Sequence, residues 1–308
     1  MYKRIYLLII AVVGTWMFTA CQKDRTILPD LGILATNDLN DAGGGSFTYI
    51  YEPLNSRPIK VWFYTPRDAP KNVPILFIMH GVERNGQTYR NNWVNLAREN
   101  NWLIIAPEYS TAAYPGSRYY NVGNVFSGSG GTSGTLNPED QWTFSTIEAI
   151  FDHVVAKIGG TQQTYNIYGH SAGSQFVSRM VTLKSEPMRL NRAIFANAGW
   201  YTLLDVGTAY PYGISNLGLT DEQINRALAQ DVVILLGEAD VNVDDNLNTD
   251  PPAMAQGPHR FARGHYYFNY HKELAASRGV SFGWKLATVP GAGHSNRSMA
   301  PSAANFLK

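Results

Sequence analysis

One serine of this chain lies in a pattern that can turn its hydroxyl into a nucleophile. The pentapeptide Gly169-His170-Ser171-Ala172-Gly173 is a G-x-S-x-G motif that follows an apolar run at 165–168 and precedes a helical segment. In that context the motif predicts a sharp strand-to-helix turn that exposes the serine, and side chains at 169 and 173 would collide with their neighbours. The start of a helix next to Ser171 also favours developing negative charge. We therefore predict that Ser171 attacks an acyl carbon.

A serine hydroxyl is a weak nucleophile, so it needs a base and a group that orients the base. After a G-x-S-x-G turn these partners follow in the chain order Ser, Asp, His. His294 comes after the last apolar run, behind a glycine-rich loop at 290–293, and is predicted to be the base. Asp240, just past the apolar run 232–236, is predicted to orient it, and Glu238 is the alternative.

The oxyanion that forms during such an attack needs two N–H donors. The backbone N–H groups of Ala172 and Val82 are predicted to supply them, since Val82 follows His80-Gly81 at the end of the apolar run 74–79. Aromatic side chains near other strand ends are predicted to line a substrate pocket. They are Tyr109, Trp200 and Tyr201.

Four side chains repeat at the spacing that opens a calcium-binding loop: Asp240, Asn242, Asp244 and Asn246. That loop needs glycine at its sixth position and a bidentate glutamate at its twelfth. This chain has Asp245 and Pro251 there. The sequence therefore predicts a polar loop, with no metal and no cofactor.

Strand-like and helix-like segments alternate along the chain, which predicts a mainly parallel eight-stranded sheet flanked by helices. The predicted strands are 47–51, 59–64, 74–79, 102–106, 165–168, 193–196, 232–236 and 284–289. The predicted helices are 89–99, 138–158, 172–183, 264–277 and 299–306. The first two strands alternate in polarity, so we expect an antiparallel hairpin at the sheet edge. Two stretches, 108–137 and 200–230, lack this rhythm and are expected to be long insertions that build the site.

The N-terminus has the pattern of a secretory signal. Lys3 and Arg4 precede an apolar run at 5–18, which is too short to span a bilayer comfortably. The segment ending at Cys21 resembles a bacterial lipobox, and Cys21 is the only cysteine of the chain. We predict a signal peptide at 1–20, a lipoprotein tether at 21–45 and a catalytic domain at 46–308. The protein would be exported across the inner membrane and held in the bacterial envelope or at the cell surface by a lipid on Cys21.

The charge pattern argues against nucleic acid as a partner. The formal net charge is +1, and the chain has no run of basic residues. Binding to nucleic acid depends on neutralising many phosphates, so a basic patch would be expected. A small or polymeric neutral substrate fits this composition better.

These motifs make the chain resemble the poly(3-hydroxybutyrate) depolymerase-like branch of the α/β-hydrolases, which also includes feruloyl-esterase-like members. The likeness runs from about residue 59 to the C-terminus. It is carried by His80-Gly81-Val82, Ala106-Pro107-Glu108, Gly169 to Gly173, 237–240, 256–260 with Arg263-Gly264, and 290–294.

The resemblance implies an α/β-hydrolase fold and hydrolysis of carboxylic esters through Ser171, Asp240 and His294. Members of this branch differ in substrate, so the reaction class is implied more strongly than the substrate. Two other classes stay open: a serine peptidase of the same fold, and a surface lipoprotein that binds without catalysis.

Overall fold

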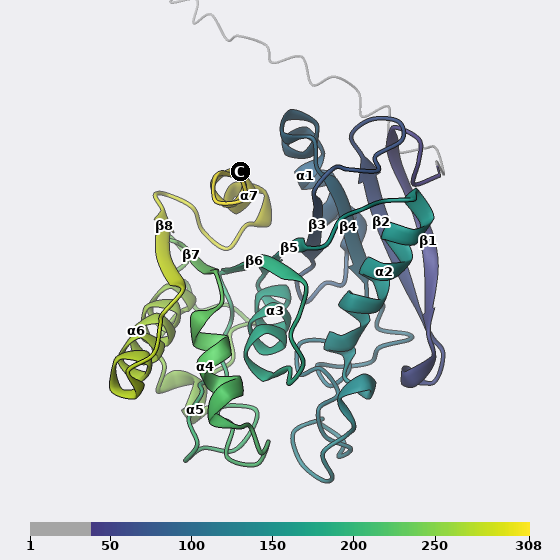
Figure 1. Ribbon diagram of the computed structural model, residues 1–308. Helices are drawn as coiled ribbons and strands as arrows, with labels where there is room; N and C mark the ends of the chain where they lie inside the picture. The colour runs from purple at the N-terminus through teal and green to yellow at the C-terminus, as the bar shows by residue number, and fades with distance from the viewer. Residues whose placement is uncertain (1–37) are drawn as a thin grey trace, which may run out of the picture. The chain divides into compact units, whose positions relative to one another are not determined.

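The computed structural model describes residues 38–308, and within them eight strands form one sheet in the order β1-β2-β4-β3-β5-β6-β7-β8 (Figure 1). The strands are β1 (Gly43–Tyr51), β2 (Arg57–Thr65), β3 (Ile75–Met79), β4 (Leu103–Glu108), β5 (Tyr165–His170), β6 (Leu190–Ala196), β7 (Val232–Gly237) and β8 (Trp284–Val289). β2 pairs antiparallel with both β1 and β4, and all other neighbours are parallel. The predicted fold class and the edge hairpin are confirmed.

The first strand begins four residues earlier than predicted. Gly43, Gly44 and Gly45 pair with Thr65, Tyr64 and Phe63 of β2. These three glycines, predicted to end the tether, therefore belong to the sheet. They can pair in a strand because the hydrogen bonds between strands involve only backbone groups. The predicted signal peptide, Cys21 and most of the predicted tether lie outside the described residues.

Helices cover both faces of the sheet (Figure 1). They are α1 (Gly86–Asn100), α2 (Thr146–Ile158), α3 (Ala172–Leu183), α4 (Asp221–Ala229), α5 (Pro251–Met254), α6 (Arg260–Arg278) and α7 (Asn296–Asn305). Among the described residues, no helix has the length and apolar character to span a membrane.

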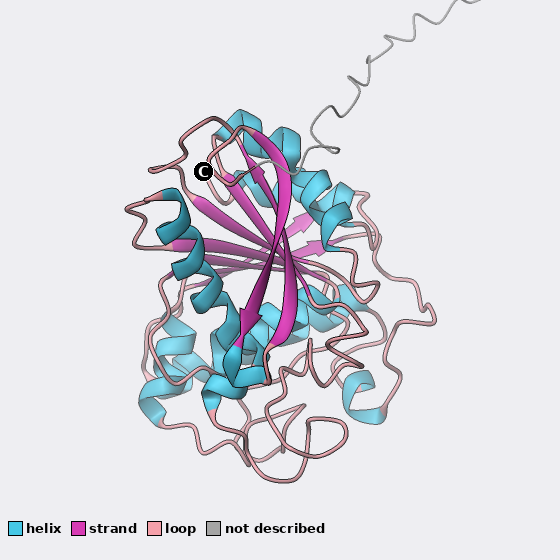
Figure 2. Ribbon diagram, turned by 90° about the vertical axis from the view of Figure 1, so that its right-hand side faces the viewer, coloured by secondary structure: helices cyan, strands magenta, loops and turns pink. Residues whose placement is uncertain are grey.

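Successive side chains of the central strands enter two different cores. Ile75, Phe77 and Met79 of β3 lie in the core beneath α2, α3, α4 and α6, whereas Leu76 and Ile78 lie in the core beneath α1 and α7. Burial on both faces is the reason why these strands read as continuous apolar runs. Figure 2 shows the strand directions fanning from the β1–β2 pair across the sheet, as expected for a twisted sheet.

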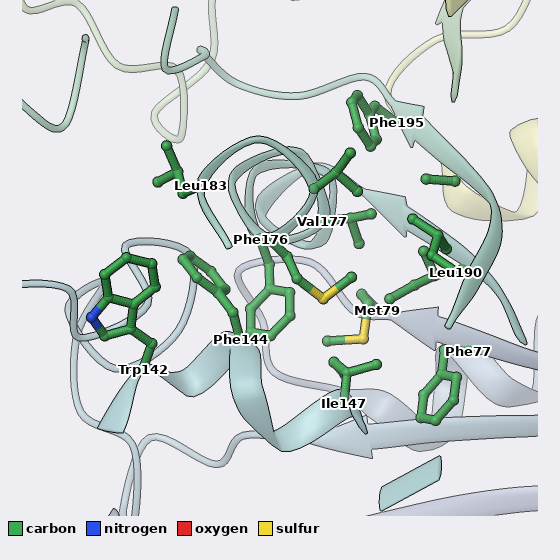
Figure 3. Packing of buried hydrophobic residues seen from close by; sticks show 14 of the residues in the cluster. Phe77, Met79, Trp142, Phe144, Ile147, Phe176, Val177, Leu183, Leu190 and Phe195 are labelled. Atoms are coloured by element: carbon green, nitrogen blue, oxygen red, sulfur yellow. The ribbon is translucent and has the colours of Figure 1, made fainter. Parts of the chain in front are cut away.

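The helix that follows Ser171 is held by aromatic packing. Phe176 of α3 contacts Phe144 edge to face, with ring centroids 4.9 Å apart, and its centroid lies 5.5 Å from that of Tyr109. Figure 3 shows Phe176 pointing from α3 toward Phe144 and Ile147. Burial of one such side chain contributes roughly 1.5–3 kcal/mol, so this packing fixes the helix that carries the nucleophile's turn.

The insertion 200–230 contains a helix that was not predicted. α4 has a capping box, in which the Thr220 side chain accepts from the Gln223 N–H and the Gln223 side chain accepts from the Thr220 N–H. The earlier part of this insertion is tied to α6 by His271, whose Nε2 accepts a hydrogen bond from the Leu204 N–H at 3.2 Å. Nδ1–H of the same ring donates to the Tyr267 carbonyl at 2.8 Å. The ring is therefore held in its neutral form.

Stability is expected to fall as the solution becomes acidic, partly because of this histidine. Burial lowers the pKa of His271 from its ordinary value near 6.5 to about 3. Between those values the unfolded chain binds a proton that the folded chain excludes, so the free energy of unfolding decreases as pH falls. One such group contributes a limiting slope of about 1.4 kcal/mol per pH unit. Urea unfolding of wild type and His271→Gln between pH 7 and 4 measures that slope, and equal slopes for the two proteins would contradict the assignment.

Candidate active site

The turn between β5 and α3 places Ser171 in a backbone conformation that few residues adopt. Its φ and ψ are 58° and −120°, and its N–H donates to the Ala196 carbonyl at 3.0 Å. A Cβ on Gly169 would lie 2.2 Å from the Gly173 carbonyl oxygen, and one on Gly173 would lie 2.2 Å from that of Met79. Since both contacts are to backbone, the two glycines are required by close approach, as the motif indicated.

Three side chains from separate parts of the chain form a continuous hydrogen-bonded series. Ser171 Oγ lies 2.9 Å from His294 Nε2, and His294 Nδ1 lies 2.7 Å from Asp240 Oδ2. With Nδ1–H donating to the carboxylate, Nε2 is free to accept the serine proton. The structure thus brings together the three residues that the sequence pointed to.

The Asp240 carboxylate is buried, with a relative side-chain exposure of 2%. The tight turn after β7 places it there, since the Asp240 N–H donates to the Gly237 carbonyl at 3.0 Å. Arg260, also buried, lies 3.6 Å from Asp240 Oδ1 and pairs with both carboxylate oxygens of Asp244 at 2.7 and 2.8 Å. The hydrogen bond from Arg260 lowers the pKa of Asp244. Asp240 thereby has a cation near the oxygen that does not face His294.

The other carboxylate considered for this role points elsewhere. Glu238 is exposed and accepts a hydrogen bond from Thr288 Oγ1 at 2.7 Å. Among the described residues, no hydrogen bond or ion pair joins Glu238 to His294, whereas Asp240 is hydrogen-bonded to it. The geometry therefore favours Asp240 over Glu238 as the partner of the imidazole.

Two backbone N–H groups beside Ser171 have no partner. Neither Val82 nor Ala172 donates a backbone hydrogen bond to any acceptor within residues 38–308. The loop before Val82 is fixed by His80, whose Nδ1–H donates to the Gly81 carbonyl at 2.9 Å and whose Nε2 accepts from the Tyr109 N–H at 3.1 Å. Burial lowers the pKa of His80 to about 3, so the ring is neutral at physiological pH. Both N–H groups are thus available to a ligand.

Two cavities flank Ser171. One of about 310 Å³, here called the Ala172 cavity, is lined by Ala172, Trp200, Gln175, Arg84 and Arg260 among others. The second, of about 470 Å³ and here called the His294 cavity, is lined among others by His294, His170, Asn85 and Asn296. Val82 and Ser171 line both, so a bound molecule could extend to either side of the serine.

Two of the three predicted pocket residues do not reach either cavity. Tyr109 is fully buried and its hydroxyl bonds to Thr146 Oγ1 at 2.6 Å. Tyr201 is also fully buried and stacks on Tyr267, with centroids 4.1 Å apart. The prediction for these two tyrosines was wrong, because each packs into the core. Trp200 lies on the wall of the Ala172 cavity.

A buried arginine joins the two insertions that form the Ala172 cavity. Arg179 Nη1 donates to the Asn121 carbonyl at 2.6 Å in the first insertion, and Nε donates to Thr202 Oγ1 at 2.8 Å in the second. Its guanidinium carbon lies 4.2 Å above the Trp200 ring. Burial lowers the pKa of Arg179. No motif marked this residue, since its partners come from irregular segments far apart in the sequence.

Arg260 and Arg263 play different parts. Arg260 lines the Ala172 cavity and also hydrogen-bonds Asp244. Arg263 donates to the carbonyls of Gly199, Asn248 and Gly257 and lines neither cavity. It therefore ties together the loops around the site.

Two solved structures resemble this chain in both sequence and fold. Poly(aspartic acid) hydrolase-1 from Sphingomonas sp. KT-1 is 38% identical, with a TM-score of 0.82 over 87% of this chain and 99% of that one. LpqC, a poly(3-hydroxybutyrate) depolymerase from Bordetella parapertussis, is 34% identical, with a TM-score of 0.81 over 88% of this chain and 91% of that one. The chain belongs to the poly(3-hydroxybutyrate) depolymerase-like branch of the α/β-hydrolases.

Membership of this branch makes the protein a hydrolase. A more distant structure, an S-formylglutathione hydrolase from Agrobacterium tumefaciens, is 14% identical with a TM-score of 0.54 over 89% of this chain and 96% of that one. That likeness concerns the α/β-hydrolase fold alone. No protein-family model and no curated protein sequence matches the chain.

Proposed function

We propose that this α/β-hydrolase cleaves carboxylic esters through an acyl-enzyme, with Ser171 as nucleophile, His294 as general base and acid, and Asp240 orienting the imidazole. The observation that carries the proposal is the unbroken hydrogen-bonded series from the Asp240 carboxylate through His294 to Ser171 Oγ. A serine paired in this way is activated at neutral pH.

In the first half of the reaction, Ser171 Oγ forms a bond to the acyl carbon while its proton moves to His294 Nε2. The carbonyl electron pair moves to oxygen, and the N–H groups of Val82 and Ala172 stabilise that oxyanion. The bond to the leaving oxygen then breaks, and His294 returns the proton to it. The alcohol departs, and the acyl group stays on Ser171.

Water completes the cycle in a second half-reaction, in which water is the nucleophile and Ser171 Oγ is the leaving group. His294 Nε2 takes a proton from the water as its oxygen attacks the acyl carbon, and then returns a proton to Ser171 Oγ as the acid leaves. Throughout, the Asp240 carboxylate stabilises the imidazolium that forms. Its burial beside Arg260 keeps the imidazole in one orientation.

Covalent labelling tests the nucleophile directly. An alkyl fluorophosphonate is expected to modify one serine, because among residues 38–308 only Ser171 has a general base at hydrogen-bonding distance together with two free N–H groups beside it. Intact-mass and peptide mass spectrometry should place a single adduct on Ser171. Absence of any adduct, or an adduct on another serine of the folded protein, would contradict the proposal.

Amide hydrolysis is the second candidate. One relative is named for poly(aspartic acid), and the same three side chains could cleave an amide. The ester is favoured for this chain by the resemblance of its motifs to esterases. Turnover of short aryl esters compared with that of peptides and poly(aspartic acid) separates the two.

We also propose that the protein is exported and tethered to a membrane by a lipid on Cys21. The support is the N-terminal sequence pattern, in which an apolar run ends in small residues before the only cysteine of the chain. A tethered hydrolase of this kind would act on substrates at the cell envelope or outside the cell.

A further inference from the structure

The His294 cavity contains buried polar atoms that have no partner. Asn296 is only 7% exposed, and neither Nδ2 nor Oδ1 of its side chain has a hydrogen-bond partner among the described residues. The same holds for Asn85 Oδ1 and His170 Nε2. All three residues line this cavity together with Ser171 and His294. Unpaired polar atoms of three residues therefore lie in the wall of the cavity that contains the nucleophile.

The free nitrogen of His170 is a hydrogen-bond donor. Its other nitrogen, Nδ1, lies 2.9 Å from the Tyr89 hydroxyl, which can donate to it. When the Tyr89 hydroxyl donates its proton to Nδ1, the ring proton of His170 lies on Nε2. Burial lowers the pKa of His170 well below its ordinary value, so the ring is neutral. The cavity thus offers a donor from His170, an acceptor from Asn85 and both from Asn296.

Helix formation does not explain these residues. Ser295 caps α7 by accepting from the Ser298 N–H, so Asn296, the first residue of the helix, is not needed as a cap. Asn85 precedes α1 but makes no capping hydrogen bond with its side chain. Leaving a buried polar group unpaired destabilises a protein, and native structures contain few such groups. Their concentration in one cavity indicates a ligand that pairs with them.

The position of the cavity says which part of a substrate it would hold. In the proposed reaction His294 delivers a proton to the leaving oxygen, so the leaving alcohol must lie on the His294 side of Ser171. The cavity lined by Ala172, one of the two oxyanion donors, then remains for the acyl group. Glu83 and Arg297, both exposed, bring one charge of each sign to the wall of the His294 cavity, which favours a neutral occupant.

We infer that the His294 cavity is the leaving-group subsite, and that Asn296, supported by His170 and Asn85, selects alcohols that carry neutral groups able to donate and accept hydrogen bonds, such as hydroxyls. This inference rests on the proposed ester hydrolysis and adds its alcohol specificity. A hydrocarbon chain in the same place would leave these buried polar atoms without a partner. The enzyme should therefore discriminate against alkyl esters.

A pair of esters that differ only in the alcohol tests this. Glycerol 1-monobutyrate and n-propyl butyrate share the acyl group and the three-carbon alcohol skeleton, and only the first has two further hydroxyls. We expect kcat/KM for the glycerol ester to exceed that for the propyl ester by about tenfold or more, after division by their rates of hydrolysis in alkali. In Asn296→Leu, which keeps the number and branching of the non-hydrogen side-chain atoms but replaces the amide oxygen and nitrogen with methyl groups, this ratio should fall at least about fivefold.

Two further variants complete the experiment. Asn305→Leu changes an exposed asparagine at the other end of α7 and should keep the wild-type ratio. Asn85→Ala removes an acceptor without removing a helix cap, so it should fold and lower the ratio even if Asn296→Leu does not fold. A wild-type ratio near one, or an unchanged ratio in both Asn296→Leu and Asn85→Ala, overturns the inference while ester hydrolysis stands. Failure of wild type to hydrolyse either ester would refute the proposed function, and the inference with it.

Discussion

Replacing Ser171 with alanine is expected to lower kcat/KM for a short-chain aryl ester by about 10⁴–10⁶-fold. The variant loses the oxygen that forms the acyl-enzyme, and His294 Nε2 loses the hydroxyl that lies 2.9 Å away. The residual rate would come from the two N–H groups of Val82 and Ala172 and from binding alone. Initial rates with a p-nitrophenyl ester measure the loss.

Ser174→Ala is the matched control for this experiment. Ser174 lies three residues further along, in α3, is fully buried, and its hydroxyl has no hydrogen-bond partner among the described residues. Its removal should leave both turnover and the melting temperature close to wild type. Ester hydrolysis by Ser171→Ala at the wild-type rate, in protein free of contaminating esterase, would refute the role of Ser171.

Asp240→Asn is expected to lower kcat by about 10³–10⁴-fold while the fold stays intact. Asparagine has nearly the same shape as aspartate, but its amide N–H can face His294 Nδ1 and make that nitrogen an acceptor. The imidazole proton then resides on Nε2, which can no longer accept the proton of Ser171. Steady-state kinetics with the same aryl ester measure the effect, and a normal thermal unfolding curve shows that the fold is retained.

Glu238→Gln distinguishes the two carboxylates that the sequence left as alternatives. Glu238 is exposed and hydrogen-bonds Thr288, so its replacement should change kcat by less than about twofold, as expected for a surface change. The reverse result, with a large loss in Glu238→Gln and little in Asp240→Asn, would assign the orienting role to Glu238.

Much of the fold followed from the sequence because buried parallel strands must be apolar on both sides. The runs at 74–79 and 232–236 became β3 and β7 almost unchanged. Ser171 could be selected because it directly follows such a strand, and His294 because it follows the last strand behind a glycine-rich loop. The carboxyl ends of parallel strands meet at one edge of the sheet. The structure then brought these two residues to hydrogen-bonding distance.

The pocket was harder to predict because its walls come from irregular segments. Nothing in the sequence tells whether an aromatic side chain next to a strand end turns toward the cavity, as Trp200 does, or into the core, as Tyr201 does. The direction depends on backbone angles that no periodic pattern reveals. That the amide of Asn296 is unpaired could not be predicted either, because only the packing around it shows that it lacks a partner.

One element that was not predicted could have been recognised from the sequence. Thr220 followed three residues later by Gln223 is a capping box, which would have predicted α4 inside the second insertion. The glycines at 43–45 gave a false signal, because a glycine-rich segment resembles a linker although it can pair in a strand. A chemical pattern for a cap was thus more informative here than composition.

The buried guanidinium of Arg179 limits how the Ala172 cavity of this enzyme could be redesigned. It bonds Asn121 in one insertion and Thr202 in the other, and the Trp200 ring lies against it. Grafting a homologous loop in place of either insertion alone would remove hydrogen-bond acceptors from this buried charge, and a buried charge without its partners destabilises the fold by several kcal/mol. Where relatives in this branch differ in acyl preference, we therefore expect both insertions and the residue at position 179 to differ together.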